Sequence, residues 1–149
     1  MDGPLRELYQ ETIMGHNRSP HNFRTLEHAD ADALGHNPLC GDKLRIQVVY
    51  DGDAIKEVAF MGEGCAISKA SASMMTDAVK GLSKDDAAIL YAAFHALVTR
   101  EGDTDPKLLG KLRVFAGVGE FPARVKCAAL PWRTLMAAME GEGQPVATE

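Results

Sequence analysis

Three cysteines, Cys40, Cys65 and Cys127, are the residues of this chain whose chemistry most needs an explanation. An odd number of thiols cannot all pair within one chain, and nothing marks secretion, so we expect reduced cysteines in a cytoplasmic protein. A thiolate is both a nucleophile and a metal ligand, and a helix N-terminus or a nearby cation lowers the pKa of a thiol. Metal binding, nucleophilic chemistry and burial in a core are therefore the three roles to separate.

Asp42 stands two positions after Cys40 and adds an oxygen ligand to the three sulfurs. The intervening Gly41 allows a tight turn, which would let both side chains meet one metal ion. Three thiolates and one carboxylate make up the four ligands of a tetrahedral zinc site, and soft sulfur favours zinc or iron over magnesium or calcium. Spacing alone leaves simple burial open, because the chain has no Cys-x-x-Cys pair.

Each cysteine lies near a predicted boundary between elements, where active sites tend to be built. Cys40 joins a loop to a strand, and Cys65 opens a helix. Cys127 follows Arg124 and Lys126 near the start of the last helix. We predict that these two cations support the site, either by favouring thiolate or by meeting an acidic partner; the alternative is that both are solvated.

Hydrophobic periodicity predicts an α+β fold in which a small antiparallel sheet of two or three strands packs with about five helices. Leu44, Ile46 and Val48 alternate with polar residues, and Asp51-Gly52 marks a hairpin turn before a returning strand over 54–61. Segment 16–39 has no period and is rich in turn formers, so we predict it to be irregular. The predicted helices cover residues 4–15, 65 to about 79, 83–98, 105 to about 115, and a last segment from near 127 or 131 to 140.

Length and composition limit the function classes. The 149 residues fit one domain, predicted over 1–140, with a flexible C-terminal tail over 141–149. Sixteen Lys and Arg against 21 Asp and Glu give a net charge of −5, without the cationic cluster that a nucleic-acid partner needs. The longest apolar run, 87–94, is far shorter than the roughly 20 residues of a membrane span. We therefore expect neither nucleic acid nor membrane as a partner.

Three ordered motifs identify a known family. They are Asn37-Pro38-Leu39-Cys40-Gly41-Asp42, then Gly64-Cys65-Ala66-Ile67-Ser68 leading into a Ser/Ala/Met-rich helix, then Phe121-Pro122-Ala123-Arg124-Val125-Lys126-Cys127. Over residues 5–140 the chain resembles the iron–sulfur assembly scaffold family, which comprises IscU proteins and the N-terminal domain of NifU. An extra segment over 103–119, and Lys126 where IscU proteins have histidine, resemble its SufU branch.

The resemblance implies a SufE/NifU-like fold and a metal site made by Cys40, Asp42, Cys65 and Cys127. It implies zinc as the cofactor, with a transient [2Fe–2S] cluster or iron as the alternative. Lys126 in place of an imidazole ligand favours zinc. Four histidines in segment 16–39 match no ligand position of the family, and we do not expect them to bind the metal.

The implied function is that of a zinc-dependent sulfur acceptor, a sulfurtransferase. It would take persulfide sulfur from a pyridoxal-phosphate cysteine desulfurase of the SufS type and pass it to a downstream iron–sulfur assembly complex. A scaffold that assembles a [2Fe–2S] cluster, and a zinc-stabilised interaction domain without sulfur chemistry, are the alternatives. A fully ligated zinc is inert, so one thiolate must leave it. We predict Cys40 as this catalytic thiolate, because it follows a long irregular segment and adjoins Gly41.

Overall fold

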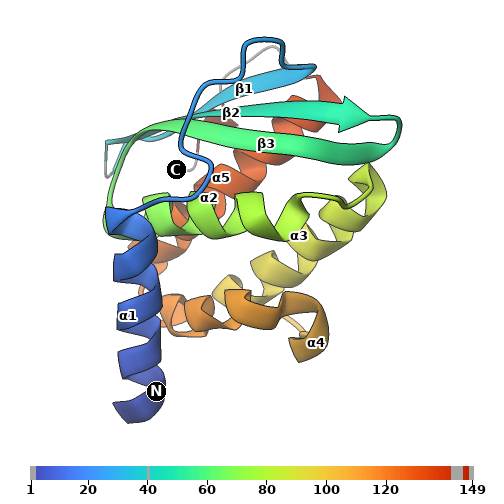
Figure 1. The fold of residues 1–149 in the computed structure, drawn as a ribbon. Coiled ribbons are helices and arrows are strands. Elements are labelled where there is room, and N and C mark those ends of the chain that lie inside the picture. The colour runs from blue at the N-terminus through green and yellow to red at the C-terminus, as the bar shows by residue number, and fades with distance from the viewer. Residues whose placement is uncertain (1–2, 40, 142–145, 148–149) are drawn as a thin grey trace.

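The computed structural model describes residues 3–39, 41–141 and 146–147, and the side chains from Gln10 onward. One mixed sheet lies over a layer of helices, so the predicted α+β class is confirmed (Figure 1). The helices are α1 (Gly3–Arg18), α2 (Ala66–Val79), α3 (Lys84–Thr99), α4 (Pro106–Leu109) and α5 (Pro122–Glu140), with a 3-10 helix, η1 (Gly110–Glu120). The strands are β1 (Ala31–Asn37), β2 (Asp42–Asp51), β3 (Ala54–Glu63) and β4 (Val146–Ala147).

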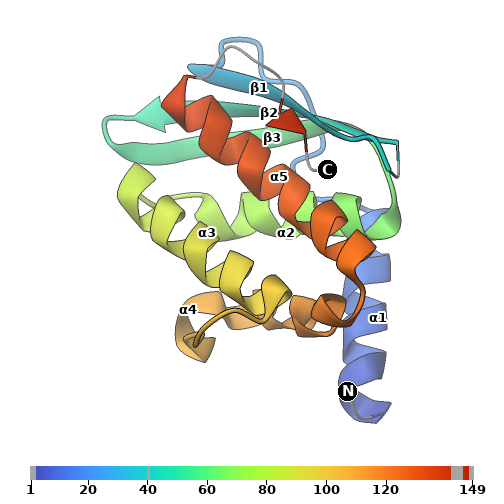
Figure 2. The same ribbon diagram turned by 180° about the vertical axis from the view of Figure 1, so that it is seen from behind.

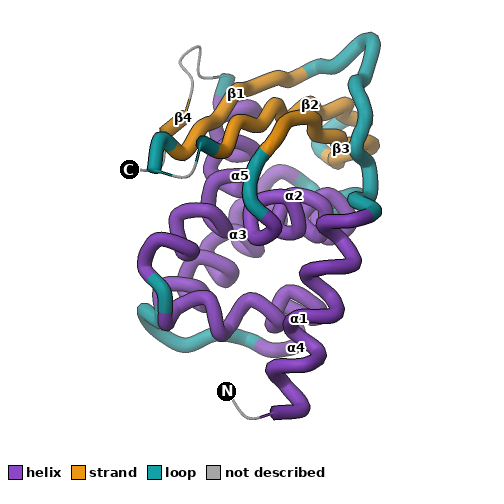
Figure 3. The backbone as a smooth tube through the Cα atoms, turned by 90° about the vertical axis from the view of Figure 1, so that its left-hand side faces the viewer, coloured by secondary structure: helices purple, strands orange, loops and turns teal. Residues whose placement is uncertain are grey.

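The sheet has the order β3-β2-β1-β4, which is more strands than the two or three predicted. Strands β1, β2 and β3 pair antiparallel, and the short β4 pairs parallel with β1 at the edge of the sheet (Figure 3). β1 lies in the segment that the sequence predicts to be irregular. The alternation was not visible in the sequence because the inward positions of β1 are Ala33, Gly35 and Asn37 rather than large apolar residues. A side chain at Gly35 would collide with Thr134 of α5, so this strand can approach the helix only without one.

β2 shows the predicted period of two and extends it to the candidate ligand. Its buried inward positions are Asp42, Leu44, Ile46 and Val48. Helices α2 and α5 lie against this face of the sheet, and α5 crosses it diagonally (Figure 2). The alternation that buries the apolar residues therefore also turns Asp42 toward the helices.

The helix boundaries differ from the prediction in the last third of the chain. A helix begins near residue 105, as predicted, with Asp105 as N-cap and Pro106 in the first turn of α4, but Gly110 has a φ of +53° and the chain continues as η1 to Glu120. α5 then begins at Pro122, whose fixed φ suits a first helical position. Cys127 is therefore inside α5 rather than at its start. None of the helices in the described ranges is long and apolar enough to cross a membrane.

Aromatic packing holds α5 in place. The ring of Trp132 stacks on Phe94 of α3 at 4.8 Å between centroids, and Phe94 meets Phe115 of η1 edge-on at 5.5 Å. All three side chains are fully buried. Such pairs contribute about 0.5–1.5 kcal/mol each beyond the burial of their area. The segment 103–119 thus packs on the same core that positions Cys127.

Two histidines of the predicted irregular segment fasten α1 to α2. His16 Nδ1 lies 2.7 Å from Ser73 Oγ, and the backbone N–H of His21 donates to the same hydroxyl at 2.8 Å. The His21 ring also pairs with Asp77. These contacts hold the C-terminal end of α1 against α2, and the N-terminal end of α1 projects away from the sheet (Figure 1).

Replacing His16 with glutamine should make the protein less sensitive to acid. Burial, and then the charge of His21, lower the pKa of His16 from 6.5; Asp77 opposes this and Lys111 adds to it. The folded protein thus takes up a proton at His16 less readily than the unfolded chain, and stability falls as the pH drops below 6.5. Urea unfolding at pH 7.5 and pH 5.5 should show a smaller loss for His16→Gln than for wild type. An equal loss would contradict this, and His28→Gln, at an exposed histidine, should behave like wild type.

Candidate metal centre

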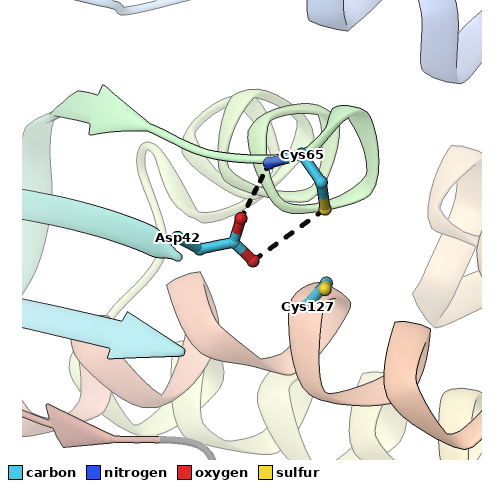
Figure 4. A group of neighbouring side chains, drawn as sticks. All are labelled: Asp42, Cys65 and Cys127. Atoms are coloured by element: carbon cyan, nitrogen blue, oxygen red, sulfur yellow. Dashed lines mark hydrogen bonds between the residues drawn. The ribbon is translucent and has the colours of Figure 1, made fainter. Parts of the chain in front are cut away.

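Asp42, Cys65 and Cys127 come together from three elements at one end of the sheet. Asp42 begins β2, Cys65 directly precedes α2, and Cys127 lies in α5 (Figure 4). One ligand atom of each lies within 4.8 Å of those of the other two. Within the described ranges no histidine takes part in such a group. The sequence prediction that these three residues are neighbours agrees with this geometry, and metal binding by them stays a prediction.

The carboxylate of Asp42 is fully buried. Its Oδ1 accepts the backbone N–H of Cys65 at 2.7 Å, and its Oδ2 lies 3.9 Å from Cys65 Sγ. No lysine, arginine or histidine among the described residues forms an ion pair with it. A buried carboxylate without a cation is costly, so a metal ion beside it fits this donor set.

Cys65 occupies the N-cap of α2, where thiolate is favoured. Its Sγ accepts the backbone N–H of Ser68 at 3.4 Å, and the positive end of the helix dipole adds to the effect. The pKa of the thiol is lowered to about 7, first by a hydrogen bond with Cys127 and also by the Ser68 N–H, while burial and the charge of Asp42 oppose the shift. Near neutral pH much of Cys65 is thus already the form that binds metal.

Cys127 lies in the second turn of α5 and is 2% exposed. Its Sγ accepts a hydrogen bond from Asn37 Nδ2 at 3.5 Å. Asn37 closes β1, pairs with Asp42 across the sheet, and is itself fully buried. The role of Asn37 was not predicted from the sequence, although this residue opens the motif that contains Cys40.

Gly64 is a second residue whose role sequence reasoning missed. A Cβ at this position would lie 2.7 Å from Asp42 Oδ1, a distance that real Cβ atoms essentially never show, and 3.1 Å from its Cγ, which is also tight. The absence of a side chain therefore lets the Asp42 carboxylate reach the backbone of Cys65. The glycine directly before a candidate metal-binding cysteine was the available signal.

Gly64→Ala should weaken metal binding although it changes no ligand. The added methyl group would push the Asp42 carboxylate aside, and changes in groups that orient metal ligands typically cost about 10- to 100-fold in affinity. Zinc affinity measured by competition with a coloured chelator would show the effect. Gly15→Ala is the matched control, because a Cβ there has no atom within 4 Å. Equal affinity of Gly64→Ala and wild type would show that this close approach is dispensable.

The remaining predicted site residues have separate outcomes. Cys40 lies outside the described residues, and its role as ligand and acceptor stays a prediction; its neighbour Gly41 has a φ of +73°, the left-handed turn for which glycine suits. Arg124 lines a cavity of about 430 Å³ together with Cys65 and Cys127, and its guanidinium lies over the Phe121 ring. Lys126 is partly exposed and is not part of this lining.

Comparison with known proteins agrees with the resemblance seen in the motifs. A family model described as the NifU-like N terminal domain matches residues 8–128. The iron-sulfur cluster assembly scaffold protein IscU of Streptococcus pyogenes serotype M1 is 41% identical over 136 residues, which is 91% of this chain and 85% of that protein. The zinc-dependent sulfurtransferase SufU of Bacillus subtilis is 40% identical over 131 residues, which is 88% of each chain.

Solved structures show the same fold. A crystal structure described as an iron–sulfur cluster assembly scaffold protein for the SUF system, from Fervidobacterium islandicum, superposes with a TM-score of 0.84 at 34% identity and covers 90% of this chain and 98% of that one. The N-terminal part of a NifU-like protein from Brucella abortus, at 20% identity and a TM-score of 0.82, shares the fold. The predicted fold class is thus confirmed by the structure of this chain and by its similarity to these solved structures.

Proposed function

The chain belongs to the family of NifU-like N-terminal domains, which serve iron–sulfur cluster assembly, and from this premise we propose that it is a zinc-dependent sulfur acceptor. The observation that carries the proposal is the meeting of Asp42, Cys65 and Cys127, with donor atoms within 4.8 Å, around a buried carboxylate that has no cation among the described residues. The name of the Bacillus subtilis relative, a zinc-dependent sulfurtransferase, supports the same choice.

Zinc would be held by Cys40, Asp42, Cys65 and Cys127. When bound, it would keep the thiols deprotonated and join the first residue of β2, the N-cap of α2 and the second turn of α5. The chain prepares part of this state by itself, because a hydrogen bond with Cys127, and then the Ser68 N–H at the N-cap, already lower the pKa of Cys65. Asp42 is the oxygen ligand of the set, and Gly64 gives it room.

Sulfur would arrive as a persulfide on a pyridoxal-phosphate cysteine desulfurase. The thiolate of Cys40 attacks the outer sulfur of this persulfide and forms a new S–S bond. The bond between the outer sulfur and the desulfurase cysteine breaks, and that cysteine leaves with the electron pair as a thiolate. The proton on the outer sulfur stays on that sulfur as it moves to Cys40. The exchange consumes neither oxidant nor reductant.

Two cations and a cavity support this reaction in the proposal. The cavity beside Cys65 and Cys127 gives the incoming persulfide a place to enter, and Arg124 on its lining attracts negative sulfur. Lys126 directly precedes Cys127 in the sequence and is partly exposed. In the proposal it would meet an acidic surface of the desulfurase. The persulfide is then passed to a downstream iron–sulfur assembly complex. We assign this activity to the cytoplasm, where thiols stay reduced.

Assembly of a transient [2Fe–2S] cluster is the second candidate function. The observation that favours it is the 41% identical relative named as a scaffold protein IscU. Thiolate ligands suit iron–sulfur clusters as well as zinc. Metal analysis of freshly purified protein separates the two functions: one tightly held zinc and no visible absorbance supports the sulfur acceptor, whereas a brown protein that exchanges zinc for a cluster on anaerobic reconstitution supports the scaffold.

The turnover of a SufS-type desulfurase tests the proposed function. Alanine production from cysteine should rise when the zinc-loaded protein is added in excess, because removal of the persulfide frees the desulfurase for its next cycle. Gly15→Ala, which leaves the site intact, should stimulate as well as wild type does. No stimulation at any protein concentration would refute sulfur acceptance and would leave a zinc-stabilised interaction domain as the better account.

A further inference from the structure

Asn37 connects the β1–β2 loop to the buried thiol on α5. Its backbone carbonyl accepts the N–H of Gly41 at 2.9 Å, and its side-chain Oδ1 accepts the N–H of Leu39 at 3.2 Å. Both bonds close the four-residue loop 38–41 that contains Cys40 in sequence. The third bond, from Nδ2 to Cys127 Sγ, leaves this loop and reaches another element.

The orientation of the Asn37 amide follows from these partners. The N–H of Leu39 needs an acceptor, so Oδ1 must face it, and the NH₂ group is then the one that faces Cys127. Asn37 and Cys127 are 0% and 2% exposed, so water competes little for this bond. A buried N–H donor is therefore aimed at a sulfur that the proposed function makes a metal-binding thiolate.

We propose that Asn37 is a positioning residue that keeps Cys127 as the retained, unreactive thiolate of the site. A hydrogen bond to a thiolate stabilises its negative charge and ties up an electron pair that would otherwise attack an electrophile. Asn37 thus connects the backbone of Leu39 and Gly41 to the sulfur of Cys127. The inference rests on the proposed function for the presence of a metal, and on the structure alone for the bond to Cys127.

Asn37→Asp and Asn37→Ala together separate the donor from the loop closure. Asn37→Asp keeps an oxygen for the Leu39 N–H but removes the donor that faces Cys127, whereas Asn37→Ala removes both. If only loop closure matters, Asn37→Asp behaves like wild type. If the donor matters, Asn37→Asp is impaired as well. Asn17→Asp, the same chemical change on α1, is the matched control for the added charge.

The first measurement is metal affinity. We expect Asn37→Asp to bind zinc about 10- to 100-fold more weakly than wild type in a chelator competition, the usual cost of losing a group that supports a ligand. Asn17→Asp should match wild type. Unchanged zinc binding by Asn37→Asp would overturn the proposal, since losing the N–H donor would then have no effect. Tighter binding would also overturn it, since the new carboxylate would then act as a ligand.

The second measurement reads the sulfur directly. With cobalt(II) in place of zinc, the thiolate-to-cobalt charge-transfer band of Asn37→Asp should shift to longer wavelength, because the sulfur electrons are no longer stabilised by the N–H donor. In the cobalt-loaded protein, where Cys127 is held as thiolate, iodoacetamide should also label Cys127 of Asn37→Asp faster relative to Cys65 than in wild type, as followed by peptide mass spectrometry. An unshifted band with an unchanged labelling ratio would refute the role of Asn37.

These outcomes distinguish a failure of the inference from a failure of the proposed function. If wild-type protein binds cobalt with a thiolate band but Asn37→Asp does not differ from it, the inference fails and the metal site stands. If wild-type protein binds no metal, the metal site fails; a labelling ratio in metal-free protein that differs between Asn37→Asp and wild type then still supports the contact with Cys127, and an equal ratio refutes it. Thermal unfolding of each variant confirms that folded proteins are being compared.

Discussion

Cys40→Ser is expected to abolish persulfide acceptance while the protein stays folded. A serine hydroxyl is not ionised near neutral pH and cannot form the S–S bond by which the outer sulfur is taken over. Wild-type protein incubated with desulfurase and cysteine should gain one sulfur atom, detected as a mass increase. Trypsin should release this sulfur on the peptide 25–43, which carries Cys40 alone of the three cysteines. The variant should gain none.

Loss of the metal is the effect that this experiment must separate from loss of the acceptor. Cys127→Ser also removes a proposed ligand, so it provides the matched control. If Cys40 is the acceptor, Cys127→Ser still carries the added sulfur on peptide 25–43, although with lower yield. Added sulfur on the Cys65 peptide 57–69 or the Cys127 peptide 127–133 of wild-type protein would show that the acceptor is a different cysteine.

Asp42→Asn is expected to have opposite effects on the zinc-free and the zinc-loaded protein. Without metal the buried carboxylate has no cation among the described residues, and its charge opposes folding. The amide keeps the shape and can still accept the Cys65 N–H through Oδ1, so zinc-free Asp42→Asn should be more stable than zinc-free wild type.

With zinc bound, the order should reverse. Wild type then gains both the neutralised carboxylate and the full binding free energy, whereas the variant has lost its anionic ligand. Urea unfolding of wild type and variant, each with and without zinc, gives the four free energies of unfolding that show whether the order reverses. Asp32→Asn removes an exposed carboxylate of β1 and should show no such reversal. A variant less stable in both states would mean that Asp42 serves the fold and not a metal.

The parts of the fold that local chemistry determines could be predicted from the sequence. Alternation over Leu44, Ile46 and Val48 locates β2, and the helix predicted from residue 83 is found as α3, with Ser83 accepting the Asp86 N–H as its N-cap. β1 could not be found in this way, because its inward Gly35 is explained only by contact with α5, about 100 residues away in sequence. The early start of α5 at Pro122 likewise depends on η1 ending beside it.

The candidate site shows the same division. Residue types and motifs predict Asp42, Cys65 and Cys127 as ligands, and the structure brings these three together. The sequence does not reveal that Gly64 makes room for Asp42, or that Asn37 reaches Cys127 across 90 residues. Both roles arise from contacts between elements, which no local pattern records.

The central claim is that one zinc ion is held by the thiolates of Cys40, Cys65 and Cys127 and by the carboxylate of Asp42. X-ray absorption at the zinc edge of the purified protein, together with the metal-to-protein ratio, measures this donor set most directly. We expect one zinc per chain with three sulfur ligands and one oxygen or nitrogen ligand, and two sulfur ligands in Cys65→Ser if that variant retains zinc. A protein without zinc, or a zinc with fewer than three sulfur ligands in wild type, would contradict the account.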